Sequence, residues 1–157
     1  YRSAVGEINV VQRMHETEGV LGGEGNGGVI VPDLHYGRDA LAGTAFVLQH
    51  LADSGRSLSE LHDDLPHYAM VKDKLPLPDV PPERLLSAMA ERYENEDTST
   101  IDGLKIDFPD QWVHMRPSNT EPILRVYAEA ATEEAAQALA DRFKDELQSL
   151  IARADAA

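Results

Sequence analysis

Arg116-Pro117-Ser118-Asn119-Thr120-Glu121-Pro122 is a short polar segment that separates two strand-like stretches, Gln111–Met115 and Ile123–Ala130. Both stretches are rich in aromatic, β-branched and other apolar residues in a nearly alternating pattern, which is typical of β-strands. Each proline fixes its own φ and keeps the residue before it out of the helical region. The sequence therefore predicts a pinned loop between two neighbouring strands, and the fold can be worked out from this loop in both directions.

The same loop has the composition of an anion-binding site. Arg116 offers a planar guanidinium, Ser118 and Thr120 offer hydroxyls, and Asn119 offers an amide. An arginine fork can bind two oxygens of a phosphate, while hydroxyl and backbone N–H donors bind the third. Serine, asparagine and proline are also ordinary turn residues. These seven residues alone thus leave two interpretations open, a phosphate site and a plain polar hairpin tip.

Around this loop, residues 67–157 read as an α+β domain. Asp102-Gly103 predicts a hairpin turn between Thr98–Ile101 and Leu104–Phe108. The remaining elements expected here are a possible edge strand at Tyr68–Leu75, a helix from Pro82 to about Glu94, and a final helix capped by Thr132. The pattern predicts an antiparallel sheet with helices packed on one face.

Residues 1–66 have a different pattern, with helices expected at Gly6–Glu18, Arg38–Ser54 and Leu58–Leu65. Short apolar stretches at Val20-Leu21 and Val29–Val31 predict buried strands between them. Helices that alternate with buried strands indicate an α/β layer, so we expect a truncated parallel or mixed sheet. Three helices with only two strands suggest part of a larger domain.

A glycine-rich stretch lies between those two apolar stretches. Gly23, Gly25 and Gly28 satisfy the dinucleotide pattern G-x-G-x-x-G, which must lead from a strand into a helix. Here a strand-like stretch follows, which argues against nucleotide binding. Glu24 and Asn26 would instead suit sugar hydroxyls, because glycines let a ligand approach the backbone.

Composition narrows the possible functions. The net charge of −14 argues against nucleic-acid binding, and a phosphate ligand then requires a local positive cluster. The chain has no cysteine, which excludes disulfides and thiolate chemistry. No apolar run approaches the roughly 20 residues that span a bilayer, and no signal peptide is evident at the start. We expect a cytoplasmic protein that contacts neither membrane nor nucleic acid.

Two motifs in the same order resemble one enzyme family. Gly23–Gly28, with Val5–Val10 before it and Gly37-Arg38-Asp39 after it, resembles the third domain of the α-D-phosphohexomutases. These are the phosphoglucomutases, phosphomannomutases and phosphoglucosamine mutases. The Arg116–Pro122 segment looks like the phosphate-binding loop of their fourth domain. The resemblance implies that residues 1–66 form the C-terminal part of domain 3, and residues 67–157 form domain 4.

The resemblance also implies roles for individual residues. Glu24 and Asn26 would bind the sugar, and Arg116, Ser118, Asn119 and Thr120 would bind the phosphate that is not transferred. Glu7, His35 and Arg38 are candidate accessory residues near the glycine-rich stretch. Gly28 stands where some relatives have histidine, and Glu7 where some have another polar residue.

Family members interconvert sugar 1-phosphates and 6-phosphates through a phosphoserine and a sugar 1,6-bisphosphate. Their phosphoserine and Mg²⁺ loops lie in the first two domains, which this sequence lacks. We therefore expect no catalytic residue and no metal ligand here, an inactive fragment, and partners in the missing N-terminal domains and a phosphosugar. Alternatives are a non-catalytic sugar-phosphate module or a nucleotide-binding α/β module. An open sheet edge could also allow a dimer.

Overall fold

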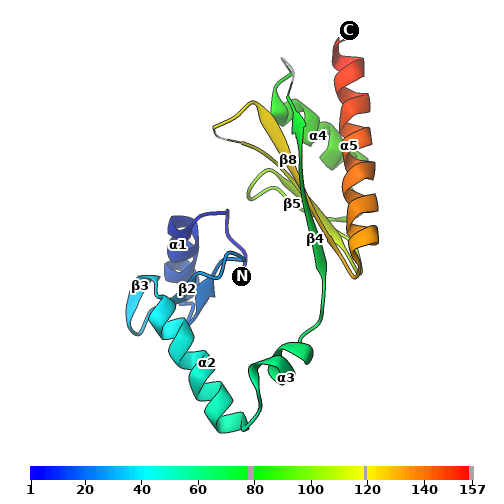
Figure 1. The fold of residues 1–157 in the computed structure, drawn as a ribbon. Helices are drawn as coiled ribbons and strands as arrows, with labels where there is room; N and C mark the ends of the chain where they lie inside the picture. Colours follow the sequence, from blue (N-terminus) through cyan, green and yellow to red (C-terminus); the bar gives the residue numbers. More distant parts are fainter. Residues whose placement is uncertain (78–79, 119, 156–157) are drawn as a thin grey trace. The chain divides into compact units, whose positions relative to one another are not determined.

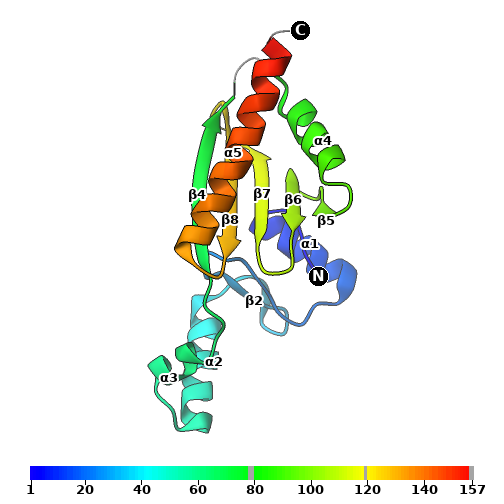
Figure 2. The ribbon, with the colours of Figure 1, turned by 90° about the vertical axis from the view of Figure 1, so that its right-hand side faces the viewer.

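A computed structural model describes residues 1–77, 80–118 and 120–155. The chain divides into two compact units, Tyr1–Pro66 and His67–Ala157. Figures 1 and 2 show the helices and strands of each unit from two directions. In the described part of the chain, no helix has the length and apolar composition needed to cross a bilayer. The two units are described separately below.

Unit 1 contains a small sheet beside helix α1 (Glu7–Thr17). Its strands are β1 (Gly22–Gly23), β2 (Val29–Val31) and β3 (His35–Arg38), in the order β1-β2-β3. Both pairings are antiparallel. The expectation of a parallel or mixed sheet is therefore wrong for these strands. It failed because only short turns join these three strands, and a parallel pair needs a longer crossover connection, usually a helix.

Two further corrections concern the borders of elements in unit 1. Val20 and Leu21 were expected in a buried strand, but they are exposed and the strand lies at Gly22–Gly23. Arg38 was expected to start a helix, but it ends strand β3. Helix α2 (Ala40–Ser54) begins only after Asp39, whose carboxylate accepts hydrogen bonds from the first free N–H groups of that helix.

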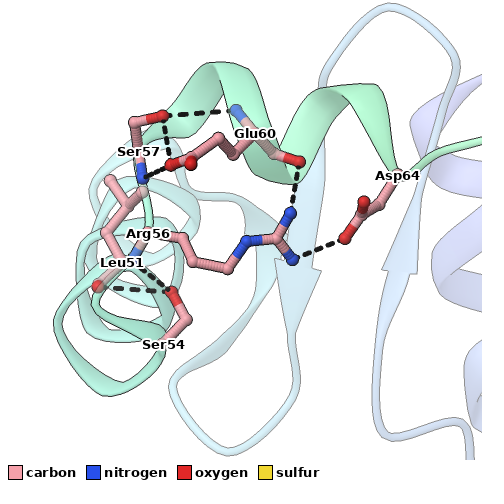
Figure 3. Close-up of polar contacts among 6 residues, drawn as sticks. All are labelled: Leu51, Ser54, Arg56, Ser57, Glu60 and Asp64. Carbon is pink, nitrogen blue, oxygen red and sulfur yellow. Dashed lines mark hydrogen bonds and ion pairs between the residues drawn. The ribbon is translucent and has the colours of Figure 1, made fainter.

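The other helices expected in unit 1 are present, although the third ends at Asp63, two residues before its expected end. Gly55 ends α2 with a φ of 65°, which is a conformation that favours glycine. Ser57 and Glu60 form a capping box at the start of α3 (Leu58–Asp63). Figure 3 shows that Arg56 reaches over this short helix and donates to the Glu60 carbonyl at 2.7 Å and to the Asp64 carboxylate at 2.5 Å. These contacts stabilise the turn between α2 and α3.

Unit 2 is a five-stranded antiparallel sheet in the order β4-β8-β7-β6-β5. The strands are β4 (Ala69–Pro76), β5 (Asp97–Ser99), β6 (Leu104–Asp107), β7 (Trp112–Pro117) and β8 (Ile123–Ala130). The predicted hairpin at Asp102-Gly103 is confirmed, because β5 pairs with β6. The predicted edge strand is confirmed as β4, which pairs only with β8 among the described strands.

Helices α4 (Pro82–Arg92) and α5 (Glu133–Asp155) cover one face of this sheet, as Figure 2 shows. Phe143 of α5 is fully buried and its ring lies 5.0 Å from that of Tyr93, which follows α4. The Tyr93 hydroxyl donates to Glu146 at 2.8 Å and accepts from Arg142 at 2.7 Å. Burial, followed by the hydrogen bond to Glu146, raises the pKa of Tyr93. Packing of α4 and α5 thus buries this face of the sheet.

Strand alternation determines which side chains face away from the helices. In β7, Val113 and Met115 are buried in the core, so Trp112, His114 and Arg116 project from the other face. Trp112 donates its indole N–H to Glu129 at 2.8 Å and lies under Lys105. The sheet face opposite the helices is therefore polar, and it carries Arg116.

Candidate functional site

The Arg116 segment begins on a strand. Strand β7 continues through Arg116 and Pro117, two residues beyond the predicted end of the strand. The loop is closed by the Ser118 N–H, which donates to the Ile123 carbonyl at 2.9 Å. The Arg116 backbone is therefore held by the sheet, and only the following residues form the turn. Asn119, a predicted phosphate ligand, lies outside the described residues.

Two hydroxyls converge in this turn. Ser118 Oγ lies 3.5 Å from Thr120 Oγ1, and the Thr120 N–H points to Ser118 Oγ at 3.5 Å. These long hydrogen bonds are weak, because good O–H···O bonds are near 2.8 Å. Both hydroxyls can thus turn toward a ligand at little cost.

Arg125, which is not among the predicted site residues, also lies near this turn. It lies directly opposite Arg116 in the pairing of β7 with β8. Its guanidinium donates to Ser118 Oγ at 3.4 Å and to the Tyr127 hydroxyl at 3.3 Å. The hydrogen bond to Tyr127 raises the pKa of Arg125. The short loop between two predicted strands could have revealed this pairing, because loop length fixes hairpin register.

The two arginines retain hydrogen-bonding capacity. Arg116 donates from Nη1 to Asp102 Oδ2 at 3.0 Å, and its side chain is 19% exposed. The Nε atoms of Arg116 and Arg125 are both buried without a hydrogen-bond partner in the described structure. A buried donor without a partner costs free energy. The described conformation therefore leaves one buried donor on each arginine unsatisfied.

A pocket of about 360 Å³ opens beside Arg116. Its walls come from α4, from the turn between β5 and β6, and from the end of β7. Arg116, Asp102 and Pro117 line one side, and Ser87 and Glu83 of α4 line the other. Arg116 is the one cationic side chain among the lining residues.

In unit 1, the glycine-rich stretch is an ordered turn centred on Glu24. The Glu24 carboxylate accepts from the Gly6 N–H at 3.0 Å and from the Asn26 amide at 3.4 Å. Asn26 Oδ1 in turn accepts from the Gly28 N–H at 3.0 Å. The predicted sugar ligands Glu24 and Asn26 are thus in contact. Strand β2 follows the turn, so the helix that a dinucleotide motif requires is not there.

Arg38 is held by Glu7, and both are candidate accessory residues. Glu7 accepts from the Arg38 backbone N–H at 3.0 Å and from its Nε at 2.8 Å. These bonds, led by the one from the backbone, lower the pKa of Glu7. Because Gly6 contacts Glu24 and Glu7 contacts Arg38, the start of α1 organises both sides of the turn.

Gly28 allows Arg38 to approach the turn closely. A Cβ atom at residue 28 would lie 2.8 Å from Arg38 Cδ and 3.2 Å from Asn26 Oδ1. A larger residue would therefore displace the Arg38 side chain. His35, another candidate accessory residue, is exposed and pairs with Asp39 at 3.1 Å. In the described structure, His35 thus contacts Asp39, the residue that caps α2.

One of the two adjacent carboxylates at residues 63 and 64 has an arginine partner. Asp64, the second of the adjacent acidic residues 63 and 64, is paired with the guanidinium of Arg56 (Figure 3). This ion pair lowers the pKa of Asp64. Mg²⁺ prefers an octahedral set of oxygen ligands. A carboxylate that is neutralised by arginine is a poor member of such a set.

Comparison with known proteins gives two adjacent family matches. Residues 1–68 match the model of phosphoglucomutase/phosphomannomutase alpha/beta/alpha domain III. Residues 72–146 match the model of the phosphoglucomutase/phosphomannomutase C-terminal domain. The two matches together cover most of the chain, and they follow each other in sequence.

Individual relatives agree with these matches. A probable phosphoglucosamine mutase of Methanopyrus kandleri is 39% identical over 92% of this chain and 32% of its own length. A phosphoglucomutase/phosphomannomutase of Thermococcus kodakarensis is 41% identical over 87% of this chain and 30% of its own length. The crystal structure of a phosphoglucomutase/phosphomannomutase family protein from Burkholderia thailandensis covers 94% of this chain and 32% of its own, with 31% identity and a TM-score of 0.74. The chain thus spans about a third of these relatives.

Proposed function

This chain belongs to the phosphoglucomutase/phosphomannomutase family, and from that premise we propose that it is the substrate-binding C-terminal portion of a phosphohexomutase. Unit 1 would correspond to the C-terminal part of domain 3, and unit 2 to domain 4. The parent enzyme would interconvert a hexose 1-phosphate and a hexose 6-phosphate.

One observation carries the phosphate-binding role: two arginines face each other across β7 and β8 beside two convergent hydroxyls. Arg116 and Arg125 are register partners, and Arg125 reaches Ser118. In a chain with a net charge of −14, such a pair is a local positive site. We propose that Arg116, Ser118, Asn119 and Thr120 bind the phosphate that is not transferred, and we add Arg125 to this set.

The sugar-binding role is assigned to Glu24 and Asn26. The Glu24 carboxylate has contacts with Gly6 and Asn26 that orient it, and a carboxylate has room for further hydrogen bonds from hydroxyls. Glu7 and Arg38 would support the turn from the side of α1. His35 is retained as an accessory candidate. Binding energy from the distal phosphate would then help to orient the sugar.

The reaction itself is assigned to parts of the parent protein outside this sequence. We propose a phosphoserine and a sugar 1,6-bisphosphate intermediate, with Mg²⁺ held by another domain of the same chain. When bound there, Mg²⁺ would neutralise charge on the transferring phosphoryl group. The partners are thus those N-terminal domains and the phosphosugar. A cytoplasmic location is part of the same proposal.

We do not propose a dimer through the edge of the sheet. The edge strand β4 carries Lys72, Asp73 and Lys74 in sequence. Charged residues, lysine above all, disfavour pairing of edge strands between molecules. Asp73 is also bound by Lys144 of α5 at 2.5 Å. This edge therefore has features that protect it from association.

The proposal is tested by titrating the 157-residue chain with glucose 1-phosphate, glucose 6-phosphate and free glucose, followed by ³¹P and ¹H NMR. We expect both phosphates to bind, free glucose to bind far more weakly, and the chain alone to show no interconversion. Equal affinity for the sugar with and without phosphate would contradict the role of the Arg116 loop. Turnover by the isolated chain would contradict its assignment as a non-catalytic portion.

A further inference from the structure

Asp102 lies where it can control the direction of the Arg116 guanidinium. Its Oδ2 accepts from Arg116 Nη1 at 3.0 Å, and the Asp102 side chain is 28% exposed. An ion pair this sheltered is less screened by water than one on the open surface. Arg116 and Asp102 also line the same pocket. One edge of the guanidinium is therefore occupied by a fixed carboxylate.

The turn that carries Asp102 is itself locked against the backbone of Arg116. Gly103 has a φ of 70°, and a Cβ atom there would lie 2.9 Å from both Cα and Cβ of Arg116 and would overlap the Met115 carbonyl oxygen. The Asp102 carbonyl accepts from His114 Nε2 at 2.5 Å. His114 and Arg116 project from the same face of β7, so one strand contacts Asp102 through two side chains.

The neighbouring charge makes such an anchor necessary. Arg125 lies opposite Arg116 and is also cationic, so the two guanidiniums repel each other. A carboxylate on one edge of Arg116 offsets this repulsion and limits rotation of the long side chain. A guanidinium with a restricted orientation loses less conformational entropy when it binds a ligand.

From this geometry we propose that Asp102 is a positioning residue for anion binding: it holds Arg116 by Nη1 so that the remaining donors of the guanidinium face the phosphate. The inference rests on the proposed function, because it assumes that Arg116 binds phosphate. It adds a residue that need not touch the ligand. Asp102 thus acts through Arg116 alone.

Two variants of equal charge separate positioning from electrostatics. Asp102→Asn and Asp102→Ala both remove one negative charge, but asparagine keeps an oxygen that can accept from Arg116 and also suits the turn before glycine. Affinity for glucose 6-phosphate is measured by ³¹P NMR in the 157-residue chain. We expect Asp102→Ala to bind about three- to tenfold more weakly than Asp102→Asn, the effect of one net hydrogen bond. Asp107→Asn, also in unit 2, controls for the change in overall charge.

The same pair of variants is then measured in the Arg116→Ala background. If Asp102 acts through Arg116, the difference between asparagine and alanine disappears there. A difference of the same size in both backgrounds would show that Asp102 acts through the turn. Equal affinities of Asp102→Asn and Asp102→Ala in the chain that retains Arg116 would show no positioning. Either result overturns the inference.

A second readout does not depend on the ligand. In ¹⁵N NMR spectra, hindered rotation about the Nε–Cζ and Cζ–Nη bonds should give separate Nη signals for Arg116, and these should merge in Asp102→Ala. Signals that stay separate in that variant would overturn the inference. If Arg116→Ala itself leaves phosphate affinity unchanged, the proposed function fails, while these signals still decide whether Asp102 holds Arg116.

Discussion

Arg116 and Arg125 lie directly opposite each other on two antiparallel strands, and Arg125 reaches over to the hydroxyl of Ser118. Like charges at opposite positions of a sheet are destabilising. Their placement here is explained if a dianion binds between them and the loop. Asp102 offsets part of the repulsion in the absence of that anion.

Replacement of Arg125 should therefore weaken phosphate binding. We expect Arg125→Ala to cost about 1.5–3 kcal/mol of binding free energy, the value for hydrogen bonds to charged groups. Arg125→Lys should recover part of the loss, because lysine keeps the charge but not the planar fork. Calorimetric or NMR titration with glucose 6-phosphate measures this effect. Unchanged affinity in Arg125→Ala would show that this arginine does not bind the phosphate and only contacts Tyr127 and Ser118.

Gly103→Ala should destabilise unit 2. Alanine at this position would adopt an unfavourable positive φ and would also overlap the Met115 carbonyl, so we expect a loss of about 1–3 kcal/mol or more. Trp112 is the single tryptophan of the chain, and its fluorescence during urea unfolding reports on unit 2.

Gly55→Ala is the matched control for this variant. Gly55 also has a positive φ, but a Cβ atom there would meet nothing within 4 Å, and the residue lies in unit 1. The urea concentration at which Trp112 fluorescence reports the unfolding of unit 2 should therefore stay the same. An equal shift in both variants would contradict the steric explanation for Gly103.

Truncation of Phe143 should have a large effect on the same transition. Phe143 is fully buried and packs against Tyr93 and Phe108. We expect Phe143→Ala to lower the unfolding free energy by about 3–5 kcal/mol. Ile101→Ala, at a residue that is 57% exposed in the same unit, should cost far less. Similar losses in the two variants would argue against the core described here.

Acid should weaken the contact between Glu7 and Arg38. The pKa of Glu7 is lowered in the folded chain, so its stabilising effect is fully present above the unfolded value of about 4.5 and is lost as the pH falls through the folded value. Hydrogen exchange of α1 amides at pH 6 and pH 3 measures this change. After correction for the intrinsic pH dependence of exchange, we expect the protection of these amides in Glu7→Gln to be lower at pH 6 and less dependent on pH. Identical pH dependence in both chains would exclude Glu7 as the cause.

Local chemistry explains why much of this fold could be predicted from sequence. Asp102-Gly103 and the capping box of Ser57 and Glu60 encode their turns within a few residues, and the hairpin predicted from Asp102-Gly103 is confirmed. The pairing of Arg38 with Glu7 joins residues 31 positions apart, and no local pattern indicates it. The role of Arg125 likewise depends on strand register. Long-range pairing was thus the part that needed the structure.

The central claim is that the Arg116 loop binds the phosphate of a phosphosugar, and its most direct test is the affinity of Arg116→Ala for glucose 6-phosphate. Arg92→Ala is the matched control, because Arg92 is an exposed arginine of α4 in the same unit that pairs with Glu146. We predict that Arg116→Ala loses about 2 kcal/mol or more of binding free energy, while Arg92→Ala binds like the unmodified chain. Equal affinities in all three chains would contradict the account.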